Sequence, residues 1–211
     1  MANSGKAIPT SVVKRLTRYL TEVQALREAE VEWVSSQELA ETLGLTSSTV
    51  RQDLSHVDFS GISRRGYRID GLERVLVDVL GVDTTWNTVV VGAGNLGRAL
   101  ALHHEFSHRG FNICGIFDSD PKKVGVKVGR LAVKGMRELP TVVGEQNVQI
   151  GIIAVPDDAA QSVGDLLIAS GIHGLLNLSL AHIVAPAGVA VTDSRVVASL
   201  LELAHAIKYR R

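Results

Sequence analysis

The stretch from Thr88 to Gly97, TVVVGAGNLG, joins a run of β-branched residues to the glycine pattern G-x-G-x-x-G. The run predicts a buried strand, and residues 95–106 after it have helical spacing. In such a strand–turn–helix, the glycines permit a tight turn, close approach of a pyrophosphate and close packing of helix on strand. The N–H groups and dipole at the helix start favour a phosphate. The predicted dinucleotide loop consists of Gly92, Ala93, Gly94, Asn95, Leu96 and Gly97.

A carboxylate stands where the second half of this fingerprint is expected. Asp118 follows Gly97 by 21 residues, at the end of the apolar strand predicted over 111–117. An acid at this place accepts hydrogen bonds from the adenosine ribose hydroxyls and repels a 2′-phosphate. The pattern therefore favours NAD(H), as NADH or NAD⁺, over NADP(H), and nearby Lys122 and Lys123 weaken that preference. The alternative is that Asp118 merely caps the next turn.

The chain after residue 82 alternates strand-like and helical segments. Strands are expected at 111–117, 149–155, 174–179 and 189–193, and helices from Asp120 and at 157–170. This order predicts a Rossmann-like α/β fold, a parallel sheet covered on both faces. Ligands of such sheets lie outside the carboxyl ends of the strands. The predicted site therefore also includes Ala154, Val155, Pro156, Asn177, Leu178 and Ser179. For Pro156, a structural role alone, at the boundary between strand and helix, is an equal explanation.

The chain before residue 82 is helical and charged. Helices are expected at 12–26, 36–43, 47–57 and 72–80, with Thr10 or Ser11 capping the first and Ser36 the second. The second and third are joined by a short turn, which is the rhythm of a helix–turn–helix. Residues 61–69, GISRRGYRI, read as a basic β-wing. The alternative is a plain helical bundle with solvated charges.

The candidate DNA-binding residues crowd the start and the exposed face of the second helix of that motif. Arg51 has the donors to pair with guanine, and Gln52 suits adenine. Arg64 and Arg65 in the wing have the charge to reach phosphate or the minor groove. The full predicted set is Lys14, Ser47, Ser48, Thr49, Arg51, Gln52, Arg64, Arg65 and Tyr67.

Composition limits the function classes. The 211 residues hold 22 basic and 22 acidic side chains, so any contact with DNA must be local. The single cysteine, Cys114, lies in an apolar run and excludes an internal disulfide, which fits a reducing cytoplasm. We find no apolar run of membrane-spanning length and no signal core, and we expect a cytoplasmic protein with no membrane association.

An enzyme is not expected. No substrate domain follows the predicted sheet, and no Tyr-x-x-x-Lys pair stands inside it. The histidines His103, His104 and His108 are explained most simply by a solvated helix end, the alternative being that they face the pocket. No His, Cys or acid grouping has metal-ligand spacing. The alternative retained is an NAD(H)- or CoA-binding enzyme or module without a DNA role.

These motifs, in their order, resemble the Rex family of NADH-sensing transcriptional repressors over nearly the whole chain. The matching stretches are SSQELAETLGLTSSTVRQDLS, GISRRGY, VVVGAGNLGRALA, GIFDSDPKKVG, IIAVPDDAAQ, SGIHGLLNLS and VASLLELAHAI. The resemblance implies a winged-helix DNA-binding domain (1–81), a Rossmann NAD(H)-binding domain (82–193) and a dimerisation helix (194–211) that crosses to the partner subunit. It also implies a homodimer that binds double-stranded palindromic operators and that NADH releases.

The sequence departs from the family pattern at positions that matter for the switch. The family usually places Lys or Arg where Gln52 stands, and its wing differs around Ser63. A family Tyr near the nicotinamide aligns with His103, and a family Asp that pairs with a helix-one arginine aligns with Arg195. We therefore expect NADH binding with a rewired or weakened redox switch, with Asp193 as the substitute acid.

Overall fold

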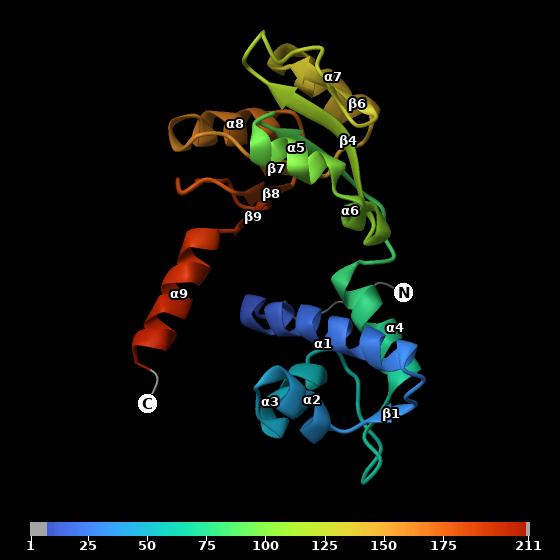
Figure 1. The fold of residues 1–211 in the computed structure, drawn as a ribbon. Coiled ribbons are helices and arrows are strands. Elements are labelled where there is room, and N and C mark those ends of the chain that lie inside the picture. The colour runs from blue at the N-terminus through green and yellow to red at the C-terminus, as the bar shows by residue number, and fades with distance from the viewer. Residues whose placement is uncertain (1–7, 210–211) are drawn as a thin grey trace. The chain divides into compact units, whose positions relative to one another are not determined.

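The computed structural model describes residues 8–209 as two compact units, one up to Thr84 and one from Thr85 onward (Figure 1). The predicted boundary near residue 82 lies close to this division. The outer ends of the predicted domains, residues 1–7 and 210–211, lie outside the described residues. The two units are taken in turn.

The first unit packs helices around a small antiparallel sheet. Its elements are α1 (Thr10–Glu28), β1 (Trp33–Val34), α2 (Ser36–Leu43), α3 (Ser47–Ser55), β2 (Tyr67–Arg68) and α4 (Ile69–Leu80). Strand β1 pairs with β2, and an isolated bridge between Ile62 and Gly66 closes the loop before β2. One core, which includes Leu16, Leu39 and Leu72, joins α1, α2, α3 and α4. This is the predicted helix–turn–helix with a wing.

The caps of these helices differ from the sequence prediction. Pro9 is the N-cap of α1 and makes no side-chain cap bond, so neither Thr10 nor Ser11 caps it. Ser35, not Ser36, caps α2, because its backbone is extended and its hydroxyl accepts from Glu38 N at 3.1 Å. The Glu38 carboxylate accepts from Ser35 N at 2.7 Å, which completes a capping box.

A buried carboxylate fastens α3 to α1. Asp53, 2% exposed, accepts from Arg15 Nε at 2.6 Å, from Arg15 Nη2 at 2.7 Å and from the Tyr19 hydroxyl at 2.7 Å. Burial raises the pKa of Asp53, but these donors outweigh burial and hold it below its ordinary value. Burial and the bond to Asp53 raise the pKa of Tyr19. Periodicity could not predict this ion pair, because Arg15 and Asp53 lie 38 residues apart.

The second unit is a seven-stranded sheet with helices on both faces. Its strands are β3 (Trp86–Val91), β4 (Phe111–Asp118), β5 (Lys127–Val128), β6 (Leu131–Gly135), β7 (Ile150–Ile153), β8 (Gly174–Asn177) and β9 (Ala190–Asp193). Their order is β5-β6-β4-β3-β7-β8-β9, and every pairing is parallel except β5 with β6. Without β5, this is the doubly wound dinucleotide-binding order, whose switch point lies between β3 and β7.

Alternation along the strands divides the core in two. Val89 and Val91 of β3 pack with α7 (Leu139–Glu145) and α8 (Asp157–Ala169), whereas Val90 belongs to the cluster that includes residues of α5 (Asn95–Leu102) and α6 (His104–His108). Helices therefore cover both faces, as predicted from the β–α alternation. The last helix, α9 (Val196–Lys208), contributes no buried residue. No helix among residues 8–209 is long and apolar enough to cross a membrane.

Two predicted helices of this unit are wrong. The helix predicted over 95–106 breaks at His103, whose backbone is extended and whose Nδ1 accepts from Glu105 N at 3.3 Å to begin α6. The segment from Asp120 is a turn, because the Asp120 carboxylate accepts from Lys122 N at 2.9 Å. The β5–β6 hairpin, the 3-10 turn η1 (Met136–Glu138) and α7 had no sequence prediction.

Loss of the Arg15 partner should weaken the first unit. We expect Arg15→Met to lower the free energy of unfolding by about 1–3 kcal/mol, because Asp53 stays buried with fewer donors. Tyr19→Phe should cost about 1 kcal/mol. Since the folded-state pKa of Asp53 is lowered, its stabilisation is present above pH about 4 and is lost as the pH falls through the folded-state pKa.

Urea unfolding across pH measures this effect. Lys14→Met is the matched control, because Lys14 is an exposed cation on the same helix. Equal stabilities of Arg15→Met and Lys14→Met at pH 7 would rule out the proposed anchoring role.

Candidate cofactor site and DNA interface

The glycine loop is fixed by close backbone approach. Gly92 has φ +107°, and a Cβ there would overlap the Ala154 carbonyl oxygen. A Cβ at Gly97 would overlap the Gly92 carbonyl oxygen, so α5 packs on the loop only because residue 97 has no side chain. The protein itself therefore requires glycine at both positions.

Gly94 is different, because among residues 8–209 no atom beyond its own local backbone lies within 4 Å of the Cβ that it lacks. Its φ of −78° is open to any residue. The fold does not explain glycine here, and a ligand that approaches the backbone does. Gly94 is the N-cap of α5 and offers no side-chain cap bond, so the first amides of α5 remain available to an anion. Asn95 and Leu96 are exposed on this turn. These features fit a pyrophosphate.

Asp118 lies beside the loop, with its side chain 8% exposed. Its Oδ2 accepts from Ala93 N at 2.7 Å and from Lys123 Nζ at 2.9 Å, and its Oδ1 accepts from Asp120 N at 2.8 Å. Burial raises the pKa of Asp118, but these three donors outweigh burial and keep the pKa below its ordinary value. Asp118 thus holds the glycine loop, and the cap of the next turn is only part of its role.

The remaining predicted cofactor residues meet at the carboxyl edge of β7 and β8. Ala154 N donates to Val91 O at 2.8 Å, and Leu178 N donates to Ile153 O at 3.0 Å, so the strand ends stay in register past the sheet. Val155 is half-buried, and Pro156 is exposed as the N-cap of α8.

Asn177 is fully buried and engaged at both ends of its amide. Its Nδ2 donates to Ala181 O and to Asp193 Oδ1, each at 2.8 Å. Its Oδ1 accepts from the Ser179 hydroxyl at 2.7 Å and from Ser179 N at 3.1 Å. Arg195 Nη2 donates to Asp193 Oδ2 at 3.1 Å. Asn177 therefore organises the edge and connects it to the start of α9, a role that its sequence position did not reveal.

The predicted recognition helix presents its polar residues outward. Thr46 caps α3 by accepting from Thr49 N at 3.1 Å. Ser48, Arg51 and Gln52 are exposed. Ser47 and Thr49 are half-buried. Arg51 Nη1 donates to Ser36 Oγ at 3.1 Å, which orients the guanidinium at the start of α2.

A groove of about 410 Å³ separates α3 from the wing. Its walls are Ser35, Ser36, Arg51 and residues 61–67. Arg64 is exposed at the wing tip with φ +63°. Tyr67 is only 6% exposed and stacks on Phe59, so it supports the groove from the core.

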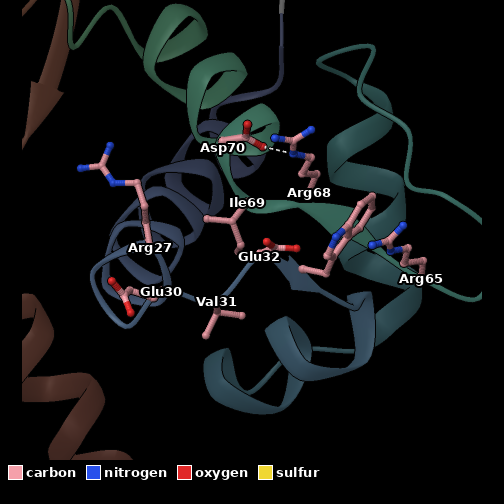
Figure 2. Close-up of a pocket in the computed structure, with 9 residues that line it drawn as sticks. Arg27, Glu30, Val31, Glu32, Arg65, Arg68, Ile69 and Asp70 are labelled. Carbon is pink, nitrogen blue, oxygen red and sulfur yellow. Dashed lines mark ion pairs between the residues drawn. The ribbon is translucent and has the colours of Figure 1, made fainter.

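Arg65 turns toward a second hollow, at the base of the wing. Its guanidinium lies 4.0 Å from the centre of the Trp33 ring. Figure 2 shows this hollow of about 540 Å³, with Arg65 at one side and the Arg68–Asp70 ion pair at another. Both basic and acidic side chains line it. The stacking of Arg65 on Trp33 joins the wing to β1, and this contact was not predicted from the sequence.

Two matches cover most of the chain between them. Residues 83–181 match the family model described as "CoA binding domain", and residues 7–55 match "Putative DNA-binding protein N-terminus". Curated relatives named "Redox-sensing transcriptional repressor Rex" include one from Desulforamulus reducens, 41% identical over 82% of each chain. Another, from Clostridium perfringens, is 34% identical over 97% of this chain and 96% of the relative. The chain belongs to the Rex family of redox-sensing transcriptional repressors.

Solved Rex structures share the fold. The repressor RSP "in complex with beta-NAD+ and operator DNA" aligns with a TM-score of 0.90 at 32% identity, over 96% of this chain and 94% of that chain. RSP "in complex with beta-NADH" aligns with a TM-score of 0.88 at 33% identity, over 96% and 95%. The Rex family consists of repressors, so the expectation that the chain is not an enzyme is confirmed.

Two of the departures from the Rex pattern, at His103 and Arg195, have structural settings of their own. His103 is exposed, caps α6 and lies edge-on to Phe106 with ring centres 5.5 Å apart. Arg195 pairs with Asp193 at 3.1 Å. The three arginines of α1 are all engaged inside the first unit: Arg15 with Asp53, Arg18 with Leu43 O at 2.6 Å, and Arg27 with Glu73 at 2.7 Å.

Proposed function

We propose that this Rex protein represses transcription by binding operator DNA through α3 and the wing, and that it binds NADH and NAD⁺ at the Gly92–Gly97 loop and Asp118. The observation that carries the proposal is the open space beside Gly94, at the position where a Cβ would lie. A repressor must reach the chromosome, so we also place the protein in the cytoplasm. The CoA-binding alternative without a DNA role is disfavoured by the Rex relatives.

The DNA-binding proposal rests on two kinds of basic residue. Arg51 is exposed on α3 and oriented by Ser36, which suits a bidentate contact with a base edge. Arg64 at the wing tip has no such orientation and suits a phosphate. Ser47, Ser48, Thr49 and Gln52 also belong to α3, and we include them in the proposed reading surface together with Lys14 of α1.

The homodimer proposal rests on α9. Val196, Leu200, Leu203 and Ile207 recur at helical spacing and are each 56–73% exposed. The sheet also has an apolar groove of about 350 Å³, lined by residues that include Phe106, Ile152 and Leu176. We propose that a second copy covers both surfaces, with α9 crossing to the partner. Isolated apolar helices of this length are marginal in water, which also argues for a partner.

The coupling proposal rests on a series of side-chain hydrogen bonds that joins Asn177 to Asp193 and Asp193 to Arg195. It runs from the carboxyl edge of β8, where the cofactor is expected, to the N-cap of α9. A ligand shifts a conformational equilibrium only through different affinities for its states. We propose that NADH and NAD⁺ affect this hydrogen-bonded series differently. Asp193 would then serve in place of the family Asp that aligns with Arg195.

Substitutions of Arg51 and Arg64 should have different effects on operator binding. We expect Arg51→Ala to cost about 1–3 kcal/mol and to relax sequence specificity, and Arg64→Ala to lower the salt slope by about one unit with specificity intact. Fluorescence anisotropy with promoter duplexes at several salt concentrations measures both. Arg74→Ala, an exposed charge on α4, is the control. Unchanged binding in all three variants would exclude this interface.

The oligomer should depend on the apolar face of α9. Wild type should have twice the mass of one chain by light scattering, and Leu200→Glu should shift it toward one chain mass because a carboxylate enters the interface. Ala198→Glu places the same charge on the opposite side of α9 and should stay dimeric. A dimeric Leu200→Glu protein at low micromolar concentration would refute the α9 interface.

The redox response should depend on Asp193. We expect operator affinity in wild type to change at least about tenfold, about 1.4 kcal/mol, between saturating NAD⁺ and saturating NADH. Gly94→Ala should fold normally and lose the response, and Asp193→Ala should retain cofactor binding with a reduced response. Asp165→Ala, an exposed acid on α8, is the control. A full response in Asp193→Ala would show that another group is the substitute.

A further inference from the structure

The carboxylate expected to hold the adenosine ribose already has a cationic partner. Lys123 Nζ lies 2.9 Å from Asp118 Oδ2, the same oxygen that accepts from Ala93 N. The Lys123 side chain is 35% exposed and that of Asp118 only 8%, so Lys123 is the more accessible member of the pair.

Hydrogen bonds within the turn after Asp118 position Lys123. The Asp120 carboxylate accepts from Lys122 N at 2.9 Å, and Asp120 O accepts from Lys123 N at 3.0 Å. Lys123 O in turn accepts from Val126 N at 3.1 Å. The turn that replaces the predicted helix therefore directs Lys123 back to the acid, while Lys122 is exposed and forms no ion pair within residues 8–209.

An ammonium in this position changes which ribose the site tolerates. Hydroxyls bound to Asp118 would lie within about two hydrogen-bond lengths, roughly 6 Å, of Lys123 Nζ. A lone acid repels a phosphate on such a ribose, whereas a cation at this range attracts it. The ammonium also competes with ribose hydroxyls for Asp118 Oδ2, so it does not favour the free diol.

We propose that Lys123 is a specificity-determining residue that lets the adenosine end of the site accept a phosphorylated ribose. The inference rests on the proposed cofactor site and names its ligand class more closely. The shared chemistry is an adenosine ribose with a phosphate at its 2′ or 3′ oxygen. NADPH and CoA are the two sources of that group. Lys123 reduces the preference for NADH that Asp118 alone would give.

Calorimetry on the full chain tests the inference with matched ligand pairs. NADH against NADPH reports a 2′-phosphate, and dephospho-CoA against CoA reports a 3′-phosphate. We expect Lys123→Met to weaken binding of NADPH, CoA or both about tenfold, about 1.4 kcal/mol, and to change NADH affinity less than about threefold. Lys122→Met, the adjacent exposed lysine, should leave every ratio within about twofold. The selective loss should shrink at high salt.

The outcomes separate the inference from the proposed function. If wild type binds no NADH, the proposed cofactor site fails. If wild type binds NADH but neither NADPH nor CoA measurably, the site rejects phosphorylated ribose and the inference is wrong. Equal losses of NADH and of the phosphorylated ligands in Lys123→Met would show that Lys123 only positions Asp118, and unchanged ratios would give it no role. Lys123→Arg keeps the charge and should retain binding of the phosphorylated ligand.

Discussion

The second unit depends on the contact between Gly97 and the carbonyl of Gly92. Because no side chain separates them, α5 begins directly against the end of β3, and its first amides point to the carboxyl edge of the sheet. Asp118 binds Ala93 N from the neighbouring strand, so β4 holds the loop that β3 creates. The ends of β7 and β8 then complete the edge. One close approach of backbone to backbone thus sets where a pyrophosphate and a ribose can lie.

A single ion pair has the corresponding part in the first unit. Asp53 joins α3 to α1 through Arg15 and Tyr19, and the partners compensate for burying a carboxylate. The same helix exposes Arg51 and Gln52 at the two preceding positions. The wing has its own support, because Tyr67 packs beneath it and Arg65 lies on Trp33. The exposed candidates on α3 and in the wing therefore stand above buried residues, Asp53 in one case and Tyr67 in the other.

Sequence periodicity predicted the elements whose burial is regular. The run of β-branched residues Val89, Val90 and Val91 and the glycine spacing were enough to predict the sheet and its loop. The breaks were not predictable, because they depend on single side chains that bond the backbone locally, as His103 and Asp120 do. Partnerships across the chain were also invisible. From the sequence, both Lys122 and Lys123 were expected near Asp118, and only the fold showed that Lys123 is the one that contacts it, at 2.9 Å.

The placement of consecutive residues on α3 bears on how such a regulator diversifies. Positions 51 and 52 face outward, and position 53 faces the core, so the proposed DNA-reading residues and the structural anchor share a helix without sharing a surface. Under the proposed function, exchanges at the outer positions would alter which bases are read and would leave the buried carboxylate and its donors intact. The operator and the recognition helix can therefore drift together over evolutionary time. The same separation makes α3 a suitable place to graft a new target preference onto an unchanged sensor.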